Sequence, residues 1–117
     1  MRRFFVSAVV ASMFFCQFGL QNTAKADGVR DQCDAAAFFA HAVMMGRQSG
    51  MSIKEAQTLA NNMLTKYKAP PAARTYYRSI VSEVFRHPRY QEKDMQSRAM
   101  NEFQDFVFTD CMKLLSR

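Results

Sequence analysis

The chain contains few of the residues that metal centres and phosphate-binding loops need. It has two histidines, His41 and His87, four glycines, and no Cys-x-x-Cys or His-Glu-x-x-His spacing. A protein zinc site uses three or four such ligands at short spacings. We therefore expect no metal site and no cofactor, and we expect His41 to be an ordinary surface or partly buried residue.

Features of β-structure are also scarce. Glycines beyond residue 26 are limited to Gly28, Gly46 and Gly50, and β-branched residues are sparse. Strands and tight hairpins therefore have little support. Apolar residues instead recur at three- and four-residue steps. These patterns predict an all-α protein.

The first 26 residues have the pattern of a secretory signal peptide. A cationic start at residues 1–3 precedes a mostly apolar run over residues 4–20. Ala24 and Ala26 supply the small side chains that signal peptidase requires. We expect cleavage between Ala26 and Asp27, with delivery of the mature chain to the periplasm or the cell exterior.

Two other interpretations of this segment fit less well. An uncleaved anchor needs about 20 apolar residues, whereas this run has 17 and includes Ser7, Ser12 and Gln17. A lipoprotein needs a small residue before its lipidated cysteine, but Cys16 follows Phe15. We therefore expect neither a transmembrane anchor nor a lipid on the mature chain.

The mature chain, residues 27–117, has the length of a single domain. Without Arg2, Arg3 and Lys25 it keeps 13 basic residues against 10 acidic ones, a net charge of +3. This charge suits solubility and gives no argument for nucleic acid, which the expected compartment also disfavours. A domain of this size is marginally stable unless it is cross-linked.

Two cysteines remain after processing, Cys33 and Cys111. In an oxidising compartment one pair allows one connectivity, so we predict a Cys33–Cys111 disulfide. The alternative is two buried free thiols. In the chain-entropy model, closing a loop of this length stabilises the fold by about 4–5 kcal/mol.

Start and stop signals divide the mature chain into four helices. Gly50 can end the first, and the Ser52–Glu55 spacing of a capping box can open the second. Prolines stop the second and third helices, because proline cannot continue a helix. The expected ranges are about 31–49, 52 to the Ala69-Pro70-Pro71 stop, about 71–86 and about 91–115. Residues 27–30 should form a frayed end.

Each helix presents an apolar stripe that should face a core. The expected core residues are Cys33, Ala36, Ala37, Ala40, Val43 and Met44; Ala56, Leu59, Ala60, Met63 and Leu64; Ala73, Tyr76, Tyr77, Ile80, Val81 and Val84; and Met95, Ala99, Phe103, Phe106, Val107, Cys111 and Leu114. An even number of antiparallel helices brings the two cysteines to one end. We therefore predict a single four-helix antiparallel bundle.

Basic and tyrosine residues concentrate between residues 66 and 90. Arg74 and Arg78 share one helix face, where guanidinium groups can fork onto carboxylates or phosphates. The candidate binding residues here are Arg74, Tyr77, Arg78, Arg86 and Arg89. They could dock an acidic protein, an anionic lipid head group or a cell-wall polymer. The alternative is a solvated face with half-buried tyrosines.

Methionine and phenylalanine are abundant, and they could fill a core or form a surface for clients. Phe38, Phe85 and Phe108 fall off the main stripe of their helices. If they are exposed together, they mark an interface, such as a homodimer contact.

Signals of catalysis are absent. The chain has no Gly-x-Ser-x-Gly motif, and the mature cysteines are assigned to a bond. Glu102 and Asp105, like Asp94 and Arg98, share a face of the last helix, but such pairs are usually solvated. We expect the protein not to be an enzyme.

Residues from Cys33 through Phe39-Ala40, Met44, Arg47-Gln48, Gly50 and Glu55-Ala56, and again Ile80, Val84, Pro88 and Cys111, form a loose pattern. The pattern resembles that of small, uncharacterised exported proteins of Gram-negative bacteria. The resemblance implies an exported helical fold with one cysteine pair and assigns no catalytic residue.

These observations favour a small exported protein that acts by binding another envelope or secreted protein, for example as an inhibitor, an immunity-type factor or an accessory subunit. One alternative is a stress chaperone that exposes its Met/Phe surface in acid. A cell-wall-active enzyme is a third, which would require a cleft with carboxylates of raised pKa.

Overall fold

The computed structural model describes residues 28–116, and helices make up most of this part of the chain. The first covers residues 28–49. It is followed by α2 (Ile53–Lys66), α3 (Pro71–Val84) and α4 (Lys93–Leu115). No strand occurs among residues 28–116, so the all-α prediction is confirmed there. The predicted signal peptide, its cleavage site and Cys16 lie outside the described residues.

Helix 28–49 and α2 are joined by a short turn with the expected capping. Gly50 has a φ of +101°, in the left-handed region that favours glycine. The amide of Met51 donates to the carbonyl of Gly46 at 2.8 Å. Ser52 Oγ accepts from the amide of Glu55 at 3.1 Å, which confirms the N-cap of α2. Residues 28–30, expected to fray, continue the helix instead.

α3 ends earlier, and α4 begins later, than the sequence predicts. Pro71 occupies the first turn of α3, where its missing N–H costs nothing. The amides of Arg86 and His87 donate to carbonyls only three residues earlier, so the chain leaves α-helical geometry after Val84 rather than at residue 86. Glu92 is extended, and α4 therefore begins at residue 93 instead of 91.

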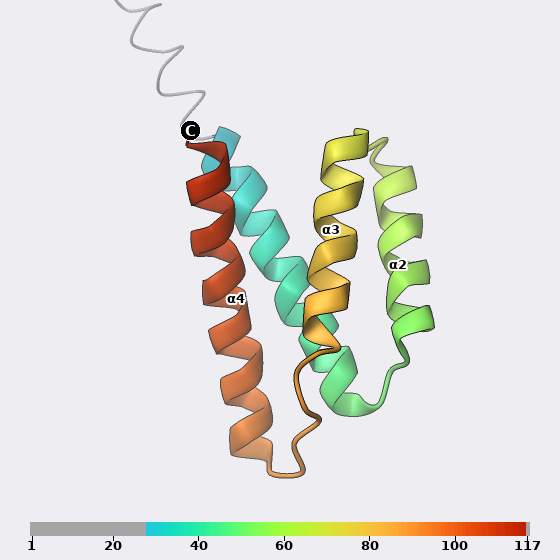
Figure 1. Cartoon of the computed structure of the whole chain (residues 1–117), viewed down its shortest axis with the longest axis vertical. Coiled ribbons are helices and arrows are strands. Elements are labelled where there is room, and N and C mark those ends of the chain that lie inside the picture. Colours follow the sequence, from blue (N-terminus) through green and yellow to red (C-terminus); the bar gives the residue numbers. More distant parts are fainter. Residues whose placement is uncertain (1–27, 117) are drawn as a thin grey trace, which may run out of the picture. The chain divides into compact units, whose positions relative to one another are not determined.

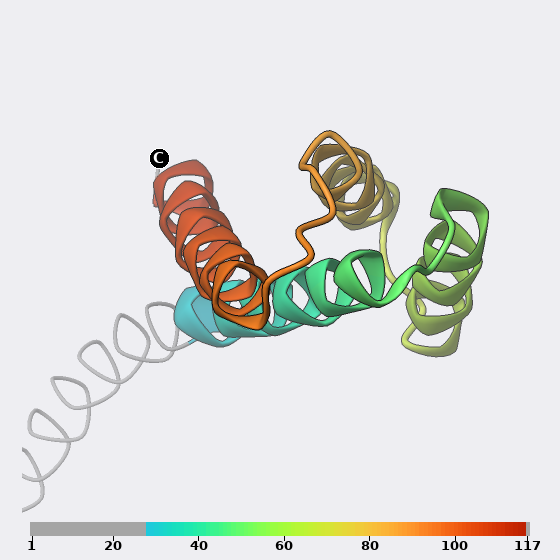
Figure 2. The same ribbon diagram turned by 90° about the horizontal axis from the view of Figure 1, so that it is seen from below.

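Residues 33–116 belong to one compact unit. Within it, residues 33–49 of the first helix and α4 run antiparallel, and so do α2 and α3 (Figure 1). α3 and α4 lie on the same side of helix 28–49, and α2 lies beyond α3 (Figure 2). The Cys33 and Cys111 sulfurs are 2.12 Å apart and their Cα atoms 5.4 Å apart. The predicted disulfide is confirmed, and it ties the end of α4 to helix 28–49.

Helix 28–49 is the centre of the core, because it supplies the largest share of the buried apolar residues. These are Cys33, Ala36, Ala37, Phe39, Ala40, Val43 and Met44 from this helix; Ala56, Ala60 and Leu64 from α2; Ile80, Val81 and Val84 from α3; and Phe103, Val107 and Cys111 from α4. The small side chains at 36, 37 and 40 leave room for close helix packing.

Three residues expected in the core are exposed. Leu59 is 56% accessible, Phe106 59% and Leu114 46%. The reason is that the buried stripes of the outer helices are narrow. α4 buries Phe103, Val107 and Cys111, which are spaced four residues apart, and a stripe of that width turns Phe106 and Leu114 away from helix 28–49. α2 contacts α3, and its Leu59 side faces solvent.

Candidate functional site

An open cavity of about 370 Å³ lies between the end of α3, the loop at 85–92 and the first half of α4. We call this cavity the α3–α4 groove. Four apolar residues of α4 line it: Met95, Ala99, Phe103 and Phe106. Its size falls in the range of ligand-binding pockets. Figure 2 shows α3 and α4 on the same side of helix 28–49, and the groove lies where the loop at 85–92 joins them.

The apolar floor of the groove is a small aromatic cluster. The rings of Phe103 and Phe106 stack with centroids 6.2 Å apart, and the His87 ring meets Phe103 edge-on at 5.4 Å. Phe103 is buried, whereas Phe106 is 59% exposed. Phe106 therefore offers most of a phenyl ring to an incoming molecule, supported from behind by Phe103.

Charged side chains edge the groove on both walls. Glu83 lies on α3, and Arg98 and Glu102 lie on α4. Glu83 Oε2 pairs with Arg86 at 3.2 Å, and Glu102 Oε1 lies 4.0 Å from Arg98 Nε. Both pairs are between neighbours on one helix turn and are exposed, so each contributes little to stability.

The loop that closes the groove is held by Gln48, whose side chain is 3% exposed. Gln48 Nε2 donates to the carbonyl of Pro88 at 3.0 Å, and Gln48 Oε1 accepts from the amide of Tyr90 at 2.7 Å. The backbone carbonyl of Gln48 accepts from Arg89 Nε at 3.1 Å. A buried carboxamide with both ends bonded fixes one loop conformation.

Two further contacts complete this attachment. Arg47 Nε and Nη2 donate to the carbonyl of His87, both at 3.4 Å, while its guanidinium lies 5.1 Å from the Phe85 ring centroid. On the other side, Gln96 Nε2 of α4 donates to the carbonyl of Tyr90 at 2.7 Å. Hydrogen bonds from helix 28–49 therefore hold His87, and hydrogen bonds from both helix 28–49 and α4 hold Tyr90.

The arginines proposed as binding residues mostly have partners within the chain. Arg74 Nε donates to the carbonyl of Ala69 at 3.1 Å, so it satisfies the turn after α2. Arg86 pairs with Glu83, and Arg89 bonds the carbonyl of Gln48. Arg78 is exposed. Of these four arginines, Arg86 is the one that pairs with a residue lining the groove, Glu83.

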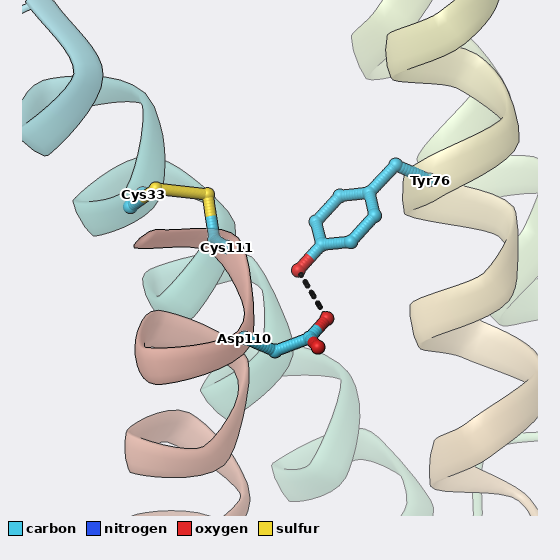
Figure 3. Close-up of a disulfide and its surroundings, with 4 residues drawn as sticks. All are labelled: Cys33, Tyr76, Asp110 and Cys111. Atoms are coloured by element: carbon cyan, nitrogen blue, oxygen red, sulfur yellow. Dashed lines mark hydrogen bonds between the residues drawn. A yellow bond between two sulfur atoms is a disulfide. The ribbon is translucent and has the colours of Figure 1, made fainter. Parts of the chain in front are cut away.

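The tyrosines of α3 pack inward. The Tyr77 ring lies 4.9 Å from that of Phe39, and burial raises the pKa of Tyr77. Tyr76 crosses to α4, where its hydroxyl donates to Asp110 Oδ2 at 3.3 Å, next to the disulfide (Figure 3). Burial, and then the charge and hydrogen bond of Asp110, raise the pKa of Tyr76 to about 12. Both rings are half-buried and make contacts within the fold.

The three phenylalanines that would mark an interface if exposed together do not share the same exposure. Phe38 is 74% exposed on helix 28–49. Phe85 and Phe108 are half-buried, and Phe85 lies beneath the Arg47 guanidinium. Phe106, which the helical pattern assigned to the core, is the exposed aromatic residue of the groove.

Two features of the groove were missed by the sequence-based reasoning. Gln48 lies four residues after Met44, on the buried stripe of its helix, and a polar residue at such a position indicates a buried hydrogen-bonding role. Phe106 carries no such signal, because its exposure depends on which side of α4 packs on helix 28–49. His41 Nδ1 donates to Gln104 Oε1 of α4 at 2.9 Å.

Among the described residues, no helix has the length and apolar character that a membrane span requires. Within residues 28–116, His, Cys, Asp and Glu side chains do not gather in groups of three or more that could hold a metal ion. The chain matches no family model, no curated protein and no solved structure in the three comparisons made.

Proposed function

We propose that the mature chain is an exported protein without catalytic activity, which binds another envelope or secreted protein through the α3–α4 groove. An inhibitor, an immunity-type factor and an accessory subunit all act in this way. The observation that carries the proposal is an apolar groove with the exposed ring of Phe106 on its floor and charges on both walls. A buried aromatic centre with a polar rim is the usual anatomy of a protein interface.

The hydrogen bonds that hold the wall of the groove indicate an ordered binding site rather than a loosely ordered surface. The loop at 85–92 is held by Gln48, Arg47 and Gln96. A wall that is ordered before binding loses less conformational entropy when the partner arrives. Phe106 is also in contact with another ring, so its position is set in advance.

The disulfide supports export, because such bonds persist in oxidising compartments. We further propose that the four helices act as one antiparallel bundle after the signal peptide is removed between Ala26 and Asp27. Start and stop signals at the helix ends, the paired directions of the helices (Figure 1) and the cysteine pair support this arrangement.

Affinity capture from envelope extracts tests the proposal. The bait is the mature chain with a C-terminal tag, compared with Phe106→Ser and with Phe38→Ser as a matched control. Both substitutions remove an exposed phenyl ring, but only Phe106 lines the groove. We expect the unaltered chain and F38S to retain one common partner and F106S to lose it. Loss in F38S with retention in F106S would move the interface to helix 28–49, where a homodimer contact was considered, and would overturn the proposal.

The second candidate function is that of a stress chaperone, and the small number of buried residues in α4 favours it. This helix has 23 residues, and only Phe103, Val107 and Cys111 are buried. Acid could release α4 from helix 28–49 while the disulfide keeps it tethered, which would expose methionine and phenylalanine side chains. Binding of an apolar dye at about pH 2–4 with retained helical circular dichroism would favour the chaperone. A folded state that binds no dye in acid would favour the groove-binding function.

A further inference from the structure

We propose that the partner segment taken up by the α3–α4 groove carries an arginine next to an apolar residue. The inference rests on the proposed function and names the chemistry of the occupant. The apolar side chain would cover Phe106, and the guanidinium would lie between Glu83 on one wall and Glu102 on the other.

The net charge of the groove lining is opposite in sign to that of the mature chain. The mature chain carries 13 basic against 10 acidic residues. The groove lining, in contrast, contains the carboxylates of Glu83 and Glu102 and the single guanidinium of Arg98. An occupant with a positive charge is therefore favoured inside the groove, while the basic surroundings repel it elsewhere.

The carboxylates remain able to accept a further cation. Glu83 Oε2 meets Arg86, and Glu102 Oε1 is 4.0 Å from Arg98 Nε, at the limit of an ion pair. Each carboxylate has a second oxygen with its own lone pairs. The existing pairs are exposed, so an incoming guanidinium can share or replace them at little cost.

Arginine fits the lining better than lysine. A guanidinium is planar, stacks on aromatic rings and forks onto carboxylates, whereas an ammonium is a compact, strongly hydrated charge. The groove offers the rings of Phe106, His87 and Tyr90 beside its carboxylates. The chain itself contains such an arrangement on the other side of the same loop, where Arg47 lies over the Phe85 ring and donates to a carbonyl.

The test uses the disulfide-bonded mature chain labelled with ¹⁵N and three capped peptides, acetyl-Gly-Phe-Xaa-Gly-amide with Xaa as Arg, Lys or Gln. We expect the arginine peptide to shift the amide signals of the loop at 85–92 and of residues 95–106. It should bind about fivefold more tightly than the glutamine peptide, the upper value for an exposed ion pair, with the lysine peptide between them. Added salt should reduce the difference.

Variants of the chain separate charge from shape. Glu83→Gln with Glu102→Gln should abolish the preference for arginine and leave binding of the glutamine peptide unchanged. The control is Asp34→Asn with Glu55→Gln, which changes the net charge equally at exposed sites outside the groove lining. Equal binding of the arginine and glutamine peptides, shifts elsewhere on the surface, or a loss of preference in the control would overturn the inference.

Partner capture distinguishes failure of the inference from failure of the proposed function. Capture that depends on Phe106 but is unchanged in the Glu83/Glu102 double variant leaves the groove as the interface and rejects arginine. Capture that depends on neither rejects both. Circular dichroism of each variant confirms folding, which substitutions of exposed carboxylates should not disturb.

Discussion

The side-chain oxygen of Gln48 accepts a 2.7 Å hydrogen bond from the backbone amide of Tyr90, 42 residues further along the chain. Its side-chain nitrogen donates to the carbonyl of Pro88 in the same loop. One buried carboxamide thereby sets the path of the chain between α3 and α4. It determines where His87 and Tyr90 stand in the groove.

Replacing Gln48 by leucine should loosen the loop at 85–92. Leucine keeps the volume but leaves the amide of Tyr90 and the carbonyl of Pro88 without a partner, at a cost of about 1–3 kcal/mol. We expect a lower urea midpoint, together with faster hydrogen exchange at Tyr90. Gln57→Leu, at an exposed position of α2, is the control and should change neither. Unchanged exchange at Tyr90 would show that the loop is held by other contacts.

Breaking the disulfide should destabilise the mature chain by about 2–5 kcal/mol, because its two cysteines are 78 residues apart in the sequence. The measurement is urea unfolding of the oxidised chain, of the reduced chain, and of the Cys33→Ser/Cys111→Ser variant. Reduction and the double substitution should have the same effect. A stability that does not respond to reductant would contradict the prediction.

Stability should fall at alkaline pH as Tyr76 ionises. Burial and Asp110 raise the pKa of Tyr76 from 10.0 to about 12, so the folded state holds the phenolic proton more tightly than the unfolded state. This contribution is fully present below pH 10 and is lost as the pH rises from 10 to about 12. Burial alone raises the pKa of Tyr77 as well and adds to the same loss.

Urea unfolding between pH 9 and pH 12, combined with phenolate absorbance, measures this dependence. Tyr76→Phe should make the fall in stability with pH less steep, while Tyr67→Phe at an exposed ring leaves it unchanged. Asp110→Asn should lower the pKa of Tyr76, because the charge that opposes ionisation is gone. Identical pH profiles for the unaltered chain and Y76F would show that Tyr76 is not the responsible group.

Lys68→Gly should stabilise the turn between α2 and α3. Lys68 has a φ of 53°, a left-handed conformation that costs a residue with a Cβ atom more than it costs glycine. We expect a gain of about 0.5–1 kcal/mol in the free energy of unfolding. Lys66→Gly, within the last turn of α2, should instead lose about that amount. If both variants are destabilised alike, the left-handed conformation is not maintained in solution.

Several helix ends were predicted accurately from the sequence, because they depend on residues that are close together in the chain. Gly50, Ser52 and the prolines at 70 and 71 act within one turn and needed no knowledge of the fold. The C-terminal end of α3 and the start of α4 were predicted less accurately, because the hydrogen bonds of Gln48 select the conformation of the intervening loop.

The all-helical class and the pairing of Cys33 with Cys111 followed from the amino-acid sequence by itself. The helical spacing of apolar residues depends on nearby positions in the chain, and two cysteines can pair in only one way. The groove was decided by the tertiary structure. Phe106 is exposed because α4 buries only the narrow stripe of Phe103, Val107 and Cys111. Which side of α4 packs on helix 28–49 is a many-body property that no spacing along the chain contains.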